Sequence, residues 1–142
     1  HSFPTRRSSD LGTYSGNPLA CAAALAVMEV FEEENILERS VVLGNKLHQR
    51  LTHWQEEFEH VDNVRNLGPM AAFEFVTDKK SRKPDAAMAG KLSKMAQEKG
   101  LILLTCGLWG NSIRVLMPVT IEDDILEEGL GIIEECLKAL HG

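Results

Sequence analysis

The stretch Val64–Val76, with the sequence VRNLGPMAAFEFV, decides the expected fold, because it holds two short strand patterns around one turn. The Gly-Pro pair at positions 68 and 69 is a strong turn signal. Val64–Leu67 and Met70–Val76 are therefore predicted to be strands. In the second strand Phe73 and Phe75 share one face, and the residues on either side of Phe73 share the other.

Two further strands are expected nearer the C-terminus. Leu101–Leu104 is a fully apolar run suited to a buried strand, and Ile113–Leu116 is a further strand candidate. Between them Cys106–Asn111, with the sequence CGLWGN, is predicted to be a glycine-containing loop.

Four helices are predicted around these strands. The first opens at Asn17-Pro18, and the second runs from about Ile36 to Glu59. The third starts at Pro84-Asp85 and stops at Gly100, and Thr120 is expected to cap the fourth. The order α, α, β, β, α, β, β, α indicates an α+β fold with helices packed on a small sheet. The apolar stripes expected to face the core are, helix by helix, Leu25, Met28 and Phe31; Leu43, Leu47, Leu51, Trp54 and Phe58; Met88, Leu92 and Met95; and Leu126, Leu130, Ile133, Leu137 and Leu140.

Composition places the chain among soluble globular proteins. Of its 142 residues, 44% are hydrophobic and 25% are charged, which excludes a disordered or collagen-like chain. A net charge of -6 argues against a nucleic-acid-binding domain, and no apolar run is long enough to span a membrane. Cys21, Cys106 and Cys136 form no CxxC pair, which fits a reduced, cytoplasmic chain without a metal.

Two places could carry chemistry. The loop Gly12–Pro18, GTYSGNP, places two glycines and the hydroxyls of Thr13 and Ser15 just before a helix N-terminus, which suits a phosphate but also suits ordinary capping. Arg114 follows a glycine-containing loop in a strand of apolar residues, and its planar guanidinium matches a carboxylate. The alternative for Arg114 is a structural ion pair with one of the chain's own acids.

Other motifs favour structural roles. Gly90–Ser93 lacks the first glycine of a phosphate-binding loop and falls inside a predicted helix. The spacing of His48, His53 and His60 does not match a helical metal site, so these histidines are expected to face solvent. The acidic run Glu32–Glu34 is more typical of a solvated helix end.

Three blocks of the sequence, GTYSGNPLACAAALAVMEVFEEENILER, VRNLGPMAAFEF and KGLILLTCGLWGNSIRVLMPVTI, resemble one known family over essentially all of Gly12–Leu140. They are similar to the C-terminal part of a class III aminotransferase, closest to the 4-aminobutyrate branch. The resemblance implies the C-terminal small domain of a fold type I enzyme, preceded by a helix from the junction with the large domain.

The resemblance also implies a cofactor, partners and site residues. It implies pyridoxal 5'-phosphate and a homodimer or larger homo-oligomer with shared active sites. Thr13, with Gly12 beside it, would bind the cofactor phosphate held by the neighbouring subunit, and Arg114 would grip a substrate carboxylate. The reaction implied is transfer of the amino group of 4-aminobutyrate, or of a related ω-amino acid, to 2-oxoglutarate.

Transamination also needs a lysine that forms a Schiff base with the cofactor. In this family that lysine lies upstream of the GTYxGNP loop, whereas no lysine precedes Lys46 here. We therefore expect no catalytic residue in this chain, and we expect the chain to be an inactive fragment by itself. The alternative from another class is a stand-alone α+β ligand-binding or regulatory module.

The opening segment His1–Leu11, HSFPTRRSSDL, has neither hydrophobic period. It resembles the translation of a sequencing-adapter oligonucleotide, so we expect it to be non-native rather than a disordered tail. The expected organisation is therefore 1–11 as this segment, 12–35 as the phosphate-contacting loop and junction helix, and 36–142 as the small domain.

Overall fold

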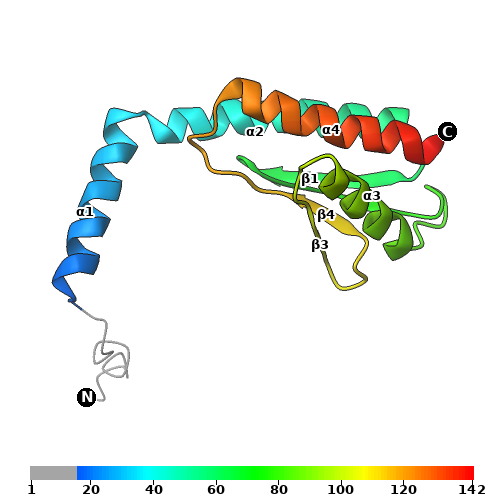
Figure 1. The fold of residues 1–142 in the computed structure, drawn as a ribbon, viewed down its shortest axis with the longest axis horizontal. Coiled ribbons are helices and arrows are strands. Elements are labelled where there is room, and N and C mark those ends of the chain that lie inside the picture. Colours follow the sequence, from blue (N-terminus) through cyan, green and yellow to red (C-terminus); the bar gives the residue numbers. More distant parts are fainter. Residues whose placement is uncertain (1–15) are drawn as a thin grey trace, which may run out of the picture. The chain divides into compact units, whose positions relative to one another are not determined.

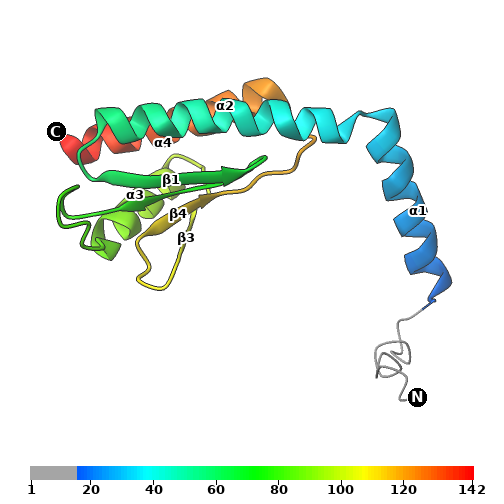
Figure 2. The same cartoon turned by 180° about the vertical axis from the view of Figure 1, so that it is seen from behind.

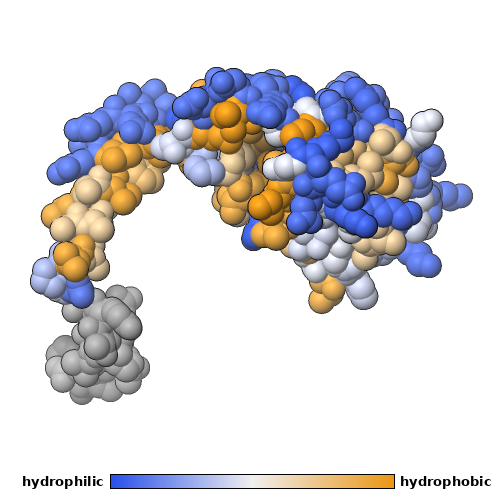
Figure 3. Space-filling view, in the orientation of Figure 1, coloured by the Kyte–Doolittle hydropathy of each residue, from blue (hydrophilic) through white to orange (hydrophobic). Residues whose placement is uncertain are grey.

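A computed structural model describes residues 16–142, and these residues divide into two compact units, with the boundary between Ile36 and Leu37. In the first unit α1 spans Pro18–Glu33, and the side chain of Asn17 accepts hydrogen bonds from two backbone amides of its first turn, as predicted. None of the residues of α1 is buried, and Figure 3 shows apolar side chains along this helix.

The helices and strands follow the predicted order α1, α2, β1, β2, α3, β3, β4, α4. The four strands form one antiparallel sheet in the spatial order β1-β2-β4-β3. Figures 1 and 2 show α2 and α4 side by side along the sheet. The bounds after α1 are α2 Ile36–Glu57, β1 Val61–Leu67, β2 Met70–Phe75, α3 Ala86–Glu98, β3 Leu104–Cys106, β4 Ser112–Val115 and α4 Asp123–His141.

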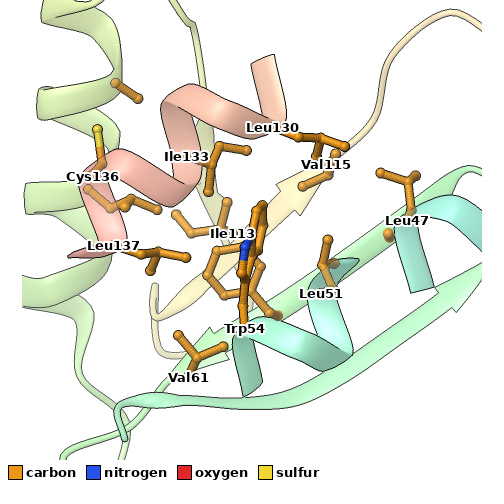
Figure 4. Packing of buried hydrophobic residues seen from close by; sticks show 14 of the residues in the cluster. Leu47, Leu51, Trp54, Val61, Ile113, Val115, Leu130, Ile133, Cys136 and Leu137 are labelled. Atoms are coloured by element: carbon orange, nitrogen blue, oxygen red, sulfur yellow. The ribbon is translucent and has the colours of Figure 1, made fainter. Parts of the chain in front are cut away.

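Three helices bury one face of the sheet and leave the other face open. The inner face presents Phe73 and Phe75 of β2 and Ile113 of β4, all fully buried. Trp54 of α2 packs edge-on against Phe73, with ring centroids 6.0 Å apart. Figure 4 shows Trp54 beside Ile113 in this core. Burying a side chain of this size stabilises the fold by about 1.5–3 kcal/mol. The predicted stripe of α2, the predicted stripe of α4 as far as Leu137, and Leu92 of α3 are buried. Met88, Met95 and Leu140 pack against the core as partly buried residues.

Charged side chains join α2 to α4 beside this core. Arg50 reaches two acids of α4, Glu127 at 2.6 Å and Glu134 at 3.3 Å. Glu134 also accepts the indole N–H of buried Trp54, and Lys46 pairs with Glu127 at 2.8 Å. The polar atom of the largest core side chain is thus satisfied by the same acid that binds Arg50.

The expected buried strand Leu101–Leu104 was wrong. Only Leu104 belongs to a strand, and both Leu104 and Ile102 are exposed. The backbone amide of Leu101 donates to the carbonyl of Ala96, so the segment begins as a continuation of the helix end rather than as a strand. The apolar composition of Leu101–Leu104 could not predict the hydrogen bond from Leu101 to Ala96.

The expected cap of the last helix was also wrong, because α4 starts at Asp123 with Glu122 at the cap position and no capping side chain. Instead, Arg39 of α2 bonds the carboxylate of Asp123 at 2.6 Å and the carbonyl of Ile121 at 2.8 Å. The acidic first turn predicted for this helix is present in Asp123 and Asp124.

The expected core stripe of the first helix is not buried. Leu25, Met28 and Phe31 are exposed, since α1 is the only complete described helix of its unit. No helix within residues 16–142 combines the length and apolar character that crossing a membrane requires.

Candidate functional site

Arg114, the residue predicted to bind a substrate, lies on the open face of the sheet. The register of the strands decides which residues lie beside it. Ala72 of β2 pairs with Arg65 of β1 on one side and with Arg114 of β4 on the other, and Arg114 pairs with Leu104 of β3. Residues directly opposite one another share a face, so two arginines flank one alanine.

Arg114 is exposed, and no carboxylate of residues 16–142 lies within 4 Å of its guanidinium. The structural ion pair considered as its alternative role is therefore not formed within the described residues. Because the guanidinium keeps its contact with water, it has no burial cost that a partner must offset.

The acids of the open face have other partners. Glu74, two residues after Ala72 in β2, forms a salt bridge with Arg65 at 2.8 Å. It also accepts a hydrogen bond from the hydroxyl of Ser112 at 3.3 Å. Asp62, which pairs with Glu74 across β1 and β2, binds Arg82 at 2.9 Å. Among the described residues, Glu74 and Asp62 on this face each pair with their own arginine, and Arg114 pairs with neither acid.

A hollow with a volume of about 420 Å³ lies on this face. Arg65 and Arg114 both line it, and Ala72 between them is too small to fill the space. Its other lining residues are mostly apolar, namely Leu67, Met70 and Ala71, with Asn66 and Cys106. A cation beside apolar walls suits a carboxylate attached to an aliphatic chain.

The loop before β4 holds Arg114 in register. The side chain of Asn111, which is buried, donates to the carbonyl of Phe75, and the amide of Phe75 donates back to the carbonyl of Asn111. Gly107 has a φ of 85°, and a Cβ added there would meet the Ser112 hydroxyl at 2.7 Å. These residues belong to the quoted block KGLILLTCGLWGNSIRVLMPVTI, but the sequence alone suggested no role for Asn111.

A second hollow, of about 310 Å³, lies between α4 and the segments around β3 and β4. Arg114 contributes to its wall, and its remaining lining is apolar apart from Gly129. It therefore offers no second charged group for a substrate.

The predicted cofactor-binding residues Gly12 and Thr13 lie outside the described residues. Neither hollow is lined by a lysine, so neither offers an amine that could react with the aldehyde of pyridoxal phosphate. Lys46 is held in a salt bridge to Glu127, and Lys79 donates to the carbonyl of Gln55. The hollow on the open face therefore presents two guanidinium groups and mostly apolar walls.

The motifs predicted to be structural have structural surroundings. His48 and His53 are exposed, but His60 is half-buried and stacks near His141, with ring centroids 5.2 Å apart. Gly90 lies inside α3. Among residues 16–142, no three His, Cys, Asp or Glu side chains gather as a metal site would require.

Known proteins match this chain over most of its length. A family model described as aminotransferase class-III matches residues 5–137. The chain is 52% identical over 129 residues to the 5-aminovalerate aminotransferase DavT of Pseudomonas putida. That alignment covers 91% of this chain and 30% of DavT. It is 46% identical over 125 residues to the 4-aminobutyrate aminotransferase GabT of Escherichia coli, covering 88% of this chain and 29% of that protein.

The fold of this chain also matches that of a solved structure. An amine transaminase from an uncultivated Pseudomonas species, in its PLP-bound form, superposes with a TM-score of 0.74 at 32% identity, over 92% of this chain and 28% of that one. The chain therefore spans about 30% of the length of the relatives that it matches.

Proposed function

The chain belongs to the class-III aminotransferase family, and we propose from this that it forms part of a longer enzyme. That enzyme transfers the amino group of 4-aminobutyrate, or of a related ω-amino acid such as 5-aminovalerate, to 2-oxoglutarate. The two named relatives act on these two donors, which supports the donor class. The match over residues 5–137 favours the enzyme over a stand-alone ligand-binding module.

Class-III aminotransferases are pyridoxal phosphate enzymes. When bound, the cofactor supplies the electron sink that amino transfer requires. We propose that Thr13 and Gly12 contact its phosphate from a neighbouring subunit, in a homodimer or larger homo-oligomer of a cytoplasmic enzyme. The described residues place no amine in the hollows, so we propose that this chain has no turnover by itself.

The observation that carries the substrate proposal is the guanidinium of Arg114, which pairs with no acid among residues 16–142. A free guanidinium can bind a carboxylate through two parallel hydrogen bonds, without first giving up an internal ion pair. It would bind and orient the α-carboxylate of 2-oxoglutarate or glutamate, and the apolar walls of the 420 Å³ hollow would contact the carbon chain. Residues of this chain thus orient the substrate, while proton transfer falls to residues elsewhere.

The test is an amino-transfer assay on the whole polypeptide that carries this chain. Purified protein is supplied with pyridoxal phosphate, 2-oxoglutarate and either 4-aminobutyrate or 5-aminovalerate, and glutamate is measured. We expect glutamate to form from at least one of these donors. Absence of glutamate with both donors, in a protein that binds the cofactor, would contradict the proposed function.

A further inference from the structure

Glu74 is the acid that strand register brings nearest to Arg114. Glu74 lies opposite Ser112, and Arg114 lies two residues further along the same strand on the same face. Such diagonal neighbours lie roughly 7–8 Å apart, which is within reach of a glutamate and an arginine. A pair between Glu74 and Arg114 is therefore geometrically available on this face.

Glu74 instead points to the other side. Its carboxylate binds Arg65 at 2.8 Å and is further held by the hydroxyl of Ser112 at 3.3 Å. Arg65 and Arg114 lie on opposite sides of Ala72, so each is a diagonal neighbour of Glu74. Glu74 binds Arg65 and not Arg114. The consequence is that Arg114 keeps its hydrogen-bonding capacity for an external anion.

We propose that Arg65 is a positioning residue for carboxylate recognition, because it holds Glu74 away from Arg114. This inference rests on the proposed function, in which Arg114 binds the substrate carboxylate. If Arg65 is lost, Glu74 is released and pairs with Arg114. Substrate then binds only the fraction of molecules in which that pair is open, and its apparent affinity falls by that fraction.

A second ion pair on the same face supplies a matched control. Arg82 binds Asp62, which lies on β1, and β2 stands between β1 and the strand of Arg114. Asp62 also accepts the backbone amide of Asn63 at 2.7 Å, which keeps its carboxylate in place. Arg82→Gln therefore removes one positive charge from this face and frees an acid that does not neighbour Arg114.

The experiment measures kcat and the KM for 2-oxoglutarate in the whole polypeptide that carries this chain. Arg65→Gln is expected to raise KM about threefold to fivefold, the effect of one exposed ion pair, with little change in kcat. Arg65→Lys, which preserves the pair with Glu74, and the control Arg82→Gln are expected to leave KM within about twofold of the parent.

The double variant decides between release of Glu74 and a general loss of positive charge. Once Glu74→Gln is present, Arg65→Gln is expected to have no further effect on KM, because no acid remains to occupy Arg114. Long-range charge would instead give additive effects, with the same rise in KM whether or not Glu74 is present. Additive effects, or a rise of equal size in Arg82→Gln, would overturn the proposal.

Arg114→Ala, measured in the same series, separates this inference from the function on which it rests. An unchanged KM in Arg114→Ala contradicts both the role of Arg114 and the role of Arg65. A raised KM in Arg114→Ala together with additive Arg65 and Glu74 variants leaves the proposed function standing and rejects the inference alone.

Discussion

Gly44 sets the distance between α2 and the turn that joins β1 to β2. A Cβ at this position would meet three backbone atoms of Gly68 at 2.7–2.8 Å, and Gly68 itself has a φ of 54°. Backbone atoms cannot move aside as the end of a flexible side chain can. The Gly-Pro turn is therefore matched by a glycine on the helix that packs against it, although the two lie 24 residues apart.

Gly44→Ala is accordingly expected to lower the free energy of unfolding by about 1–3 kcal/mol, as other overpacked sites do. Urea denaturation of this chain measures the change. Gly90→Ala is the matched control, since Gly90 also lies in a helix and a Cβ there meets nothing within 4 Å. The control is expected to gain about 0.5–1 kcal/mol from helix propensity. A Gly44→Ala variant as stable as the control would contradict this account.

At the same scale, the sequence predicted a carboxylate partner for Arg114 but not the distribution of charge around it. The residue type and its apolar neighbours were enough to predict a carboxylate partner. Whether that partner is internal depends on which acids share the face, and this depends on strand register. Glu74 and Asp62 were assigned no role, because their pairing with Arg65 and Arg82 joins residues from different elements.

Among the elements, α2 and α4 are joined by acids that titrate below their ordinary range. A hydrogen bond from Lys138 and a second from Trp54 lower the pKa of Glu134. For Glu127, the hydrogen bond from Lys46 is the largest cause of a lowered pKa. A carboxyl group whose pKa is lower in the folded state stabilises the fold above its unfolded pKa, and this stabilisation is lost as pH falls through the folded pKa.

Glu134→Gln is therefore expected to be less stable than the parent near neutral pH, by about 1 kcal/mol or less because the pair is partly solvated. The glutamine still accepts the Trp54 indole, so the change removes mainly the charge. The difference is expected to start shrinking as pH falls below the ordinary pKa of 4.5, and to disappear only once pH is below the lowered pKa of the folded carboxyl group. Chemical denaturation across this range measures it.

Glu128→Gln serves as the control on the same helix, because Glu128 is exposed and has no ion pair among residues 16–142. It is expected to track the parent at every pH. A Glu134→Gln defect that persists unchanged in acid would show that shape, rather than charge, explains the loss.

The elements with a clear period were predictable, and those without one were not. The stripe of leucines ending in Trp54 and Phe58 predicted α2, and alternation around Phe73 predicted β2. Leu101–Leu104 has no period, so its composition could not distinguish a strand from the helix exit that it forms. The start of α4 depends on Arg39, which is 84 residues away from its partner Asp123.

Considered as a whole, the described chain has two surfaces that its own residues leave uncovered. One is α1, with no buried residue, and the other is the open face of the sheet. The family model and the relatives, of which this chain spans about 30%, agree with the resemblance in the sequence blocks. The roles of Gly12 and Thr13, and the non-native origin of residues 1–11, concern residues outside the described part and stay predictions.

The central claim is that Arg114 binds the carboxylate of the amino acceptor. The most direct measurement is the KM for 2-oxoglutarate of Arg114→Ala in the whole polypeptide that carries this chain, compared with the parent. Loss of a charged, bidentate contact costs about 1.5–3 kcal/mol, so we predict a rise of at least about tenfold. A KM within about twofold of the parent would contradict the claim, since a lost charged contact changes affinity by more than that.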